Sequence, residues 1–320
     1  MKRAPIAGDH IAGNTAPATD PPWLAEFRDS LQRGDLAPAT VHGYLKDIRH
    51  FLQWRTADPE PGDFPALSEL DLIAYRQDLI TRCSLRPATV NRRLDALRRL
   101  CRWAQAAGRL PGDIAGAVRP VRTERNRQPL GLTSAEVYGL LRAAGASTHG
   151  HARRDYALMQ LLVQTGLRVG EASALHLADL ELRDRTGRVH VRDGKGRKER
   201  DVPLNATARR ALRHYLEQRP DAGAAAPLFL SGRKAALPIR SMQAIIARLA
   251  KRARLTRVPV SAHTLRHTFA LNFLRANPGK LVELASLLGH DSLDTTAIYT
   301  RPSQDDLAAD LERSPLNVDR

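Results

Sequence analysis

The sequence predicts a mainly α-helical protein with one small antiparallel sheet, divided into two domains. A length of 320 residues is enough for two domains with separate cores, because domains usually hold about 100 to 200 residues. Apolar residues recur at three- and four-residue spacing through most of the chain, which indicates amphipathic helices. The stretch 188–204 instead alternates in character around a turn that contains glycine, the pattern of a β-hairpin.

The composition is strongly basic. Lysine and arginine number 50 against 34 aspartates and glutamates, and the net charge is +16. This charge favours a polyanionic ligand, nucleic acid first, because neutralising phosphates releases counterions. A basic soluble protein without such a ligand is the alternative. No apolar run is long enough to span a bilayer. The two cysteines, Cys83 and Cys101, are too few for a disulfide framework, so we expect a cytoplasmic protein.

The amino-terminal part is predicted to be an arm followed by a helical bundle. Residues 1–22 lack the apolar core of a signal peptide and are rich in alanine, glycine, proline and threonine, so we expect a flexible arm. Helical spacing then runs through residues 23–113, with breaks at 58–65 and 107–113. Residues 114–129 are rich in arginine and proline and are predicted to be a linker.

Two segments of the predicted bundle resemble one another. Residues 38–54 align with 87–103 at a constant offset of 49, and each copy begins with proline, which is favoured in the first turn of a helix. Convergence of two amphipathic helices and a true duplication both explain the likeness. The second copy carries a set of arginines that could contact DNA or form a solvated face: Arg86, Arg92, Arg93, Arg98, Arg99 and Arg102.

Residues 130–302 are predicted to form a second domain. Helices are expected at 132–144, where Thr133 or Ser134 caps the start, and at 152–166, whose apolar residues are those of a core helix. Further helices are expected at 167–180, 241–255, 264–276 and 281–289. The hairpin 188–204 lies between them.

Tyr299, near the end of this domain, has several basic residues as candidate partners. A phenol with a pKa of about 10 attacks at neutral pH only when other groups take its proton and stabilise charge on its target. The candidates upstream are Arg168 in TGLRVGE, Lys195 in DGKGRKER, His263 and Arg266 in HTLRH, and His290 in LLGH. Two arginines could clamp the non-bridging oxygens of a phosphodiester, because guanidinium matches phosphate bidentately.

In this order and spacing, the motifs TGLRxxE, GKGxKxR, HxLRH, LLGH and TxxIYT resemble the tyrosine recombinase, or phage integrase, family, most closely its Xer-like and integrase-like branch. The resemblance runs from about residue 20 to about residue 302. It implies an amino-terminal core-binding domain that clamps DNA together with an α/β catalytic domain. The implied activity is site-specific recombination through a 3′-phosphotyrosyl intermediate, by a homotetramer on double-stranded DNA, with a second recombinase or an accessory protein left open.

The resemblance also implies a role for each candidate. Tyr299 is the nucleophile, Arg168 and Arg266 bind the phosphate, His290 bonds a phosphate oxygen, and Glu171 orients the basic groups. Lys195 is the expected general acid, with Arg197 and Lys198 as rivals on the same turn. His263 is the expected proton shuttle, whereas His267 is expected to pack structurally.

Cofactors and metals are not expected. His263 and His267 have the spacing of a metal-binding pair, but no third ligand is near them, and no carboxylate cluster suits magnesium. No nucleotide-binding P-loop motif occurs in the sequence.

Two rival functions remain at this stage. A type IB topoisomerase-like activity would use the same residues, and a DNA-binding protein with an inactive site is the non-enzymatic alternative. The acidic tail, residues 303–320, is expected to dock onto a neighbouring subunit.

Overall fold

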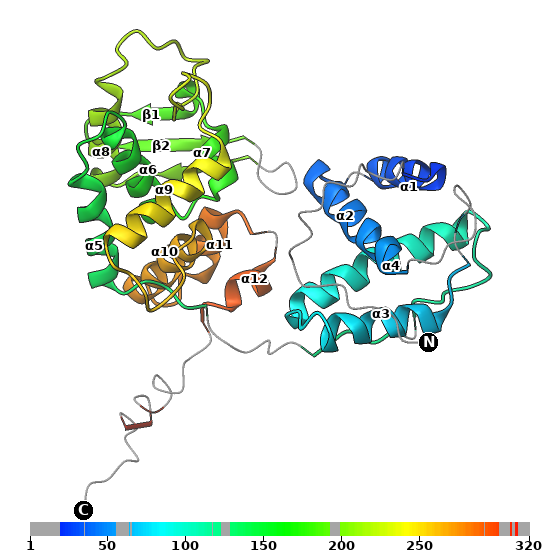
Figure 1. Ribbon diagram of the computed structural model, residues 1–320. Coiled ribbons are helices and arrows are strands. Elements are labelled where there is room, and N and C mark those ends of the chain that lie inside the picture. Colours follow the sequence, from blue (N-terminus) through cyan, green and yellow to red (C-terminus); the bar gives the residue numbers. More distant parts are fainter. Residues whose placement is uncertain are drawn as a thin grey trace, which may run out of the picture. The chain divides into compact units, whose positions relative to one another are not determined.

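The computed structural model describes residues 20–34, 36–55, 64, 66–116, 118–122, 129–192, 199–290, 292–300, 308 and 311–312. The chain divides into two compact units, Met1–Arg125 and Asn126–Arg320, and the division falls within the segment proposed as a linker (Figure 1). Each unit is described by itself. Most of the proposed arm, most of the acidic tail and the turn that carries Lys195 lie outside the described residues.

The first unit is a helical bundle. Its described helices are α1 (Pro22–Arg33), α2 (Pro38–Arg55), α3 (Glu69–Thr81) and α4 (Pro87–Ala106). The core is unusually aromatic for such a small bundle: Trp23, Phe27, Phe51 and Tyr75 are all at most 1% exposed. Large buried rings remove much apolar surface from water, so these four side chains contribute substantially to the stability of the bundle.

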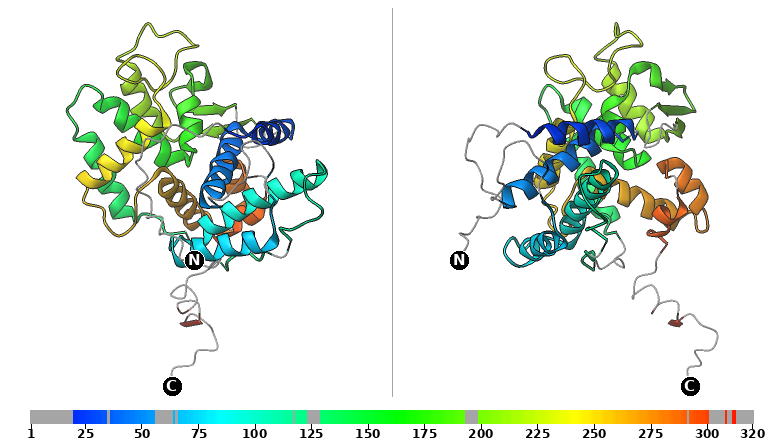
Figure 2. Two further views of the ribbon diagram at one scale, coloured as in Figure 1. Left: turned by 45° about the vertical axis from the view of Figure 1, so that its right-hand side comes forward. Right: turned by 90° about the vertical axis from the view of Figure 1, so that its right-hand side faces the viewer.

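The two similar segments form α2 and α4, which pack against each other (Figure 1, Figure 2). Both helices begin at a proline, as their sequences predict. The apolar residues that recur at helical spacing in the two segments are buried, namely Val41, Leu45 and Ile48 in α2 and Val90, Leu94, Leu97 and Cys101 in α4, while Leu52 is only partly buried. Helical periodicity alone therefore identified the faces that meet.

The second unit is mainly helical with one small sheet. Its elements are, in order, α5 (Ser134–Gly145), α6 (Ala152–Thr165), α7 (Val169–Ala174), η1 (Leu177–Asp179), β1 (Leu180–Leu182), β2 (Gly187–Val191), β3 (Arg200–Pro203), α8 (Ala206–Leu216), α9 (Ile239–Arg252), α10 (Ala262–Ala276), α11 (Leu281–Leu288) and α12 (Leu293–Ala297). The described strands form an antiparallel sheet in the order β1-β2-β3.

The predicted hairpin is confirmed in β2 and β3, where Val189 pairs with Val202. The helix predicted over residues 167–180 is wrong in its second half. It stops at Ala174, and residues 180–182 form the third strand, β1. Leu180 and Leu182 pair with Val189 and Gly187, so pairing with β2 overrides the helical spacing of this short stretch.

Helix α6 is the centre of the second core. It contacts α5, α8 and α10, and its residues Leu158, Met159 and Leu161 are completely buried, as predicted. The predicted cap of α5 is also present, because Thr133 Oγ1 accepts from the Glu136 amide and Glu136 accepts from the Thr133 amide.

Gly166 ends α6 in the left-handed conformation, with φ of +64°. A Cβ at this position would lie 2.4 Å from Phe269 Cδ1 and 3.0 Å from Leu288 Cδ2. The turn therefore requires glycine both for its backbone angle and for its close packing against α10 and α11. It leads directly into Arg168.

In the described parts of the chain, no helix is both long enough and apolar enough to cross a membrane.

Replacing Gly166 with alanine will destabilise the second unit. Left-handed backbone at a residue with a side chain costs about 1–3 kcal/mol, and the contact with Phe269 adds to that cost. Gly139→Ala is the matched control, since Gly139 lies within α5 with open space at its Cβ and alanine favours a helix by about 1 kcal/mol. Urea denaturation should give a lower midpoint for the first variant only; equal midpoints would contradict this account.

Candidate active site

The HTLRH motif lies in the first turns of α10. Ser261 caps this helix, with its hydroxyl accepting from the Thr264 amide at 3.2 Å. His263 and Arg266 are three residues apart and so lie on one face of the helix. That face meets the end of α6 and the end of α11.

Arg266 is almost completely buried, at 4% exposure, and bonds mainly to the backbone. Its Nη1 donates to the Gly166 carbonyl at 2.8 Å, and its Nη2 donates to the Leu288 carbonyl at 2.7 Å. Burial and the nearby charge of Arg168 lower the pKa of Arg266 to about 10. The guanidinium therefore remains charged at neutral pH, and its orientation is set by two carbonyls.

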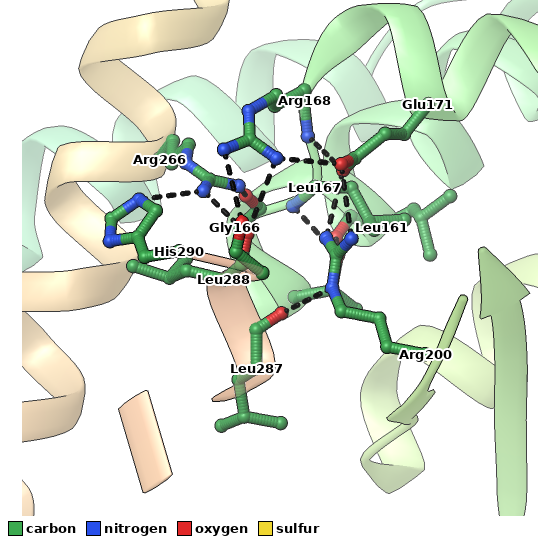
Figure 3. A network of polar contacts seen from close by, with 12 residues as sticks. Leu161, Gly166, Leu167, Arg168, Glu171, Arg200, Arg266, Leu287, Leu288 and His290 are labelled. Atoms are coloured by element: carbon green, nitrogen blue, oxygen red, sulfur yellow. Dashed lines mark hydrogen bonds and ion pairs between the residues drawn. The ribbon is translucent and has the colours of Figure 1, made fainter. Parts of the chain in front are cut away.

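Arg168 precedes α7 and lies beside Arg266 (Figure 3). Its Nη1 donates to Glu171 at 2.9 Å, and longer contacts of 3.4 Å reach the carbonyls of Leu288 and Gly289. About a third of its side chain stays exposed. Arg168 thus keeps donor capacity that solvent, or a ligand, can reach.

His290 follows the left-handed Gly289 that ends α11. Arg266 Nη2 lies 2.9 Å from His290 Nε2, and because arginine can only donate, Nε2 is the accepting nitrogen. The ring proton then lies on Nδ1, which donates to Thr296 Oγ1 at 2.8 Å. Thr296 is fully buried in α12, so it fixes the orientation of the ring.

Tyr299 follows α12 and is 5% exposed. Burial raises the pKa of its phenol, while the charges of Arg266 and Arg168 act in the opposite direction. Its hydroxyl lies 2.8 Å from His267 Nδ1. The described contacts of this hydroxyl therefore run to α10, the helix that also carries Arg266.

The contact between His267 and Tyr299 differs from the expected packing role of His267. His267 lies one helical turn after His263, and the two ring centroids are 4.1 Å apart. Burial, followed by the effects of His263 and Arg266, lowers the pKa of His267 to about 4, so the ring is neutral at pH 7. A neutral imidazole can accept the phenolic proton at Nδ1. The four-residue spacing of the two histidines places them on one face of α10, but the sequence does not indicate that Tyr299 contacts this face.

His263 lines an open cleft of about 370 Å³ together with Arg168, Arg266, Ser261 and residues of α7, α9 and the start of α10. Burial and the two arginines lower the pKa of His263. The cleft is thus bordered by two guanidiniums and one imidazole, a set suited to an anion.

Comparison with known proteins agrees with this geometry. Residues 131–305 match the profile of the phage integrase family. Tyrosine recombinase XerC of Pelobacter propionicus is 34% identical over 291 residues, which cover 89% of this chain and 92% of that protein. The chain belongs to the phage integrase family of tyrosine recombinases.

Solved structures share the fold. XerH recombinase bound to difH substrate, in a pre-cleavage complex, aligns with a TM-score of 0.68 at 21% identity over 92% of this chain and 85% of XerH. A lambda integrase tetramer bound to a Holliday junction aligns with a TM-score of 0.66 at 22% identity, covering 84% of this chain and 76% of the integrase. As a family member, this chain is a site-specific tyrosine recombinase.

The recombinase brings together most of the residues expected at its site. Arg168, Glu171, Arg266 and His290 form one connected network, His263 lies on the adjoining cleft, and Tyr299 bonds to the same helix. Lys195 lies outside the described residues. The sequence prediction omitted two further members, Thr296 and Arg200, and gave His267 only a packing role. Arg200 was visible as the last residue of GKGxKxR, and Thr296 lies inside TxxIYT.

Of the six arginines that could contact DNA, the subset proposed to do so, Arg86, Arg92, Arg93 and Arg99, lies in or beside α4 of the first unit. Arg86 and Arg92 are exposed, and Arg92 forms an ion pair with Asp47. Arg93 is turned inward, with Nη1 2.9 Å from His50 Nε2, and Arg99 is partly buried. Their contact with DNA stays a prediction, which the exposed Arg86 and Arg92 suit better than Arg93.

Within the described part of the recombinase, no group of three histidine, cysteine or acidic side chains is arranged to hold a metal.

Protonation of His267 will weaken folding at mildly acidic pH. Its pKa is about 6.5 when unfolded and about 4 when folded, so the unfolded chain binds more protons between these values. Stability is therefore highest above pH 6.5 and falls as the pH drops toward 4. His267→Asn, which keeps a polar group near the Nδ1 position but does not titrate, should lose less unfolding free energy than wild type between pH 7 and pH 5.

His42→Asn is the control for this measurement, because His42 is exposed on α2. Denaturant titrations at the two pH values should give this variant the same loss as wild type. A His267→Asn loss as large as that of wild type would show that His267 does not titrate with folding.

Proposed function

We propose that Tyr299 attacks the scissile phosphodiester of a DNA core site and forms a 3′-phosphotyrosyl bond with release of a 5′ hydroxyl. The observation that carries this proposal is that α10 holds both the Tyr299 hydroxyl, through His267, and Arg266, which contacts His290 and the ends of α6 and α11. Because the phosphotyrosyl bond conserves the energy of the phosphodiester, rejoining needs no nucleotide.

Arg168 and Arg266 act as the phosphate clamp. Charge develops on the non-bridging oxygens during the displacement, and guanidiniums held in place beforehand stabilise it without reorganisation. Arg266 is held by the carbonyls of Gly166 and Leu288, and Arg168 by Glu171. Both arginines border the cleft in which the phosphate would bind.

The histidines divide the remaining tasks. His267 holds the Tyr299 hydroxyl, and His263, on the cleft, exchanges protons at the phosphate. His290 supports Arg266 through Nε2 in the free protein. Since Nε2 is then an acceptor, binding a phosphate oxygen through this nitrogen requires a proton to arrive there. Lys195 is the proposed general acid for the leaving 5′ oxygen.

The partner is double-stranded DNA, bound by a tetramer of the recombinase. The net charge of +16 supports DNA binding, and the likeness to a lambda integrase tetramer on a Holliday junction supports this assembly. A second recombinase or an accessory protein would act at the same core sites.

The Tyr299→Phe variant will bind DNA but form no covalent adduct. Wild-type protein incubated in EDTA with nicked fragments from the region flanking its gene should give a protease-sensitive protein–DNA adduct on a denaturing gel, because Tyr299 supplies the only bond to DNA. Tyr138→Phe, which removes an exposed hydroxyl from α5, is the matched control and should give the wild-type amount. Adduct formation by Tyr299→Phe would refute the assignment of the nucleophile.

Deletion of residues 303–320 will weaken assembly on DNA. These residues are the proposed docking segment for a neighbouring subunit, so the truncated protein should still bind a single half-site as a monomer. Native gels with one and two half-sites would separate the two steps. Unchanged formation of multimeric complexes after the deletion would exclude this role.

A further inference from the structure

Arg200 connects three parts of the catalytic unit. It lies in β3, yet its side chain is only 10% exposed and reaches toward α7 and α11 (Figure 3). Its Nε donates to the Leu287 carbonyl at 2.9 Å, and its Nη1 and Nη2 donate to the two carboxylate oxygens of Glu171 at 3.1 and 2.9 Å. All three nitrogens of the guanidinium are therefore engaged.

Glu171 receives bonds from two directions. On one side, the Arg168 amide and Arg168 Nη1 donate to Oε2 and Oε1 at 2.8 and 2.9 Å. On the other side, Arg200 donates to both oxygens. An ionised carboxylate has about four lone-pair sites, and all are filled here. Burial opposes ionisation of Glu171, but the bonds from Arg200 and Arg168 outweigh it and keep its pKa below the usual range.

The last carbonyls of α11 are shared among three arginines. Leu287 accepts from Arg200, Leu288 accepts from Arg266 and Arg168, and the Gly289 carbonyl lies 3.4 Å from Arg168 Nη2. These carbonyls have no partner within the helix, and they form its partly negative end. The same helix end is therefore the support on which both clamp arginines and Arg200 rest.

Gly289 makes the approach of Arg200 possible. It adopts φ of +63°, and a Cβ there would lie 2.8 Å from Arg200 Nη1. A larger residue would push the guanidinium away from Glu171. The turn that precedes His290 is thus shaped around the Arg200 side chain.

A purely structural ion pair would explain the burial of Arg200 but not its connections. Arg200 is not among the residues that line the cleft, yet each of its acceptors also supports a clamp arginine or adjoins one that does. The carboxylate of Glu171 is paired with the Arg200 guanidinium on one side. Arg168, which is partly exposed, therefore retains donors for a phosphate.

We infer that Arg200 is a positioning residue for the phosphate clamp: it immobilises Glu171 and the end of α11, and thereby places Arg168 and Arg266. This inference rests on the proposed function and adds to it a residue that does not touch the phosphate. The inference also links the clamp to β3, the strand that follows Lys195 in the sequence.

Arg200→Met tests the inference, because methionine keeps much of the apolar stem and removes the guanidinium. Arg188→Met is the matched control, since Arg188 lies on the neighbouring β2 but is more than half exposed and pairs with Glu181 and Asp201. The unfolding midpoint of each protein is measured first. The affinity for core-site DNA and the single-turnover rate of adduct formation on nicked DNA are then measured at a temperature at which the protein is folded.

For Arg200→Met, we expect the rate of adduct formation to fall about 100-fold. A displacement of about 1 Å in an active-site group such as the clamp has a cost of this size. DNA affinity should be unchanged, because the clamp contacts one phosphate among many along the site. Arg188→Met should match wild type in both quantities. A wild-type rate for folded Arg200→Met would overturn the inference, as would a rate loss that parallels a loss of DNA affinity.

A double variant separates positioning from general damage. If Arg200 acts through Glu171, then Glu171→Gln combined with Arg200→Met should react no more slowly than the slower single variant. If the two rate losses instead multiply in the double variant, Arg200 and Glu171 act independently, which would contradict the inference. Should Arg200→Met not fold, Arg200→Lys replaces it: lysine keeps the charge but lacks the planar fork, so a slowed rate supports the inference and a wild-type rate overturns it.

The wild-type and Tyr299→Phe proteins in the same assay distinguish failure of the proposed function from failure of the role inferred for Arg200. Absence of a Tyr299-dependent adduct in wild type would refute the proposed function together with the inference. A normal wild-type adduct with an equally fast Arg200→Met would refute the role of Arg200 alone.

Discussion

The catalytic unit depends on the capture of guanidiniums by the carboxyl-terminal end of α11. Three arginines repel one another when brought close together, and two of them are largely removed from water. The last carbonyls of the helix and the buried carboxylate of Glu171 offset that repulsion. The cationic site is therefore assembled before any phosphate is present, and the fold supplies the energy that holds it.

This arrangement explains why the site suits phosphoryl transfer. Donors that already point at the position of developing charge lower the barrier without reorganising during the reaction. Burial first, and then the nearby positive charges, lower the pKa of His263 and His267, and the charges of Arg266 and Arg168 oppose the rise in the pKa of buried Tyr299. A bound phosphate would offset part of this field, so DNA binding and the proton affinity of both histidines are linked.

The hydrogen bond between His267 and Tyr299 gives α10 a second role. The helix carries Arg266, which contacts the ends of α6 and α11, and it also holds the hydroxyl that follows α12. Movement of α12 would therefore change two things together: the position of the phenol and, through Thr296, the orientation of His290. The proposed nucleophile and the proposed phosphate contact are therefore linked by one short helix.

The amino-acid sequence by itself determined the family, the helical bundle and most of the residues at the site. Apolar spacing located α2, α4 and α6 because helical periodicity needs only local information, and the motif order identified Tyr299, Arg168 and Arg266. Spacing failed at β1, where pairing with a strand several residues later decides the structure of residues 180–182.

Only the tertiary structure decided which basic residues border the cleft and which contact Glu171 instead. Arg200 and Arg168 both lie in short motifs of this chain, and nothing local distinguishes a side chain that faces a cleft from one that faces Glu171. That distinction arises from contacts between distant parts of the chain. Arg200 bonds to Glu171, which is 29 positions away, and to the end of the helix formed by residues 281–288. The role of His267 was hidden for the same reason, because its partner Tyr299 lies 32 residues away in sequence.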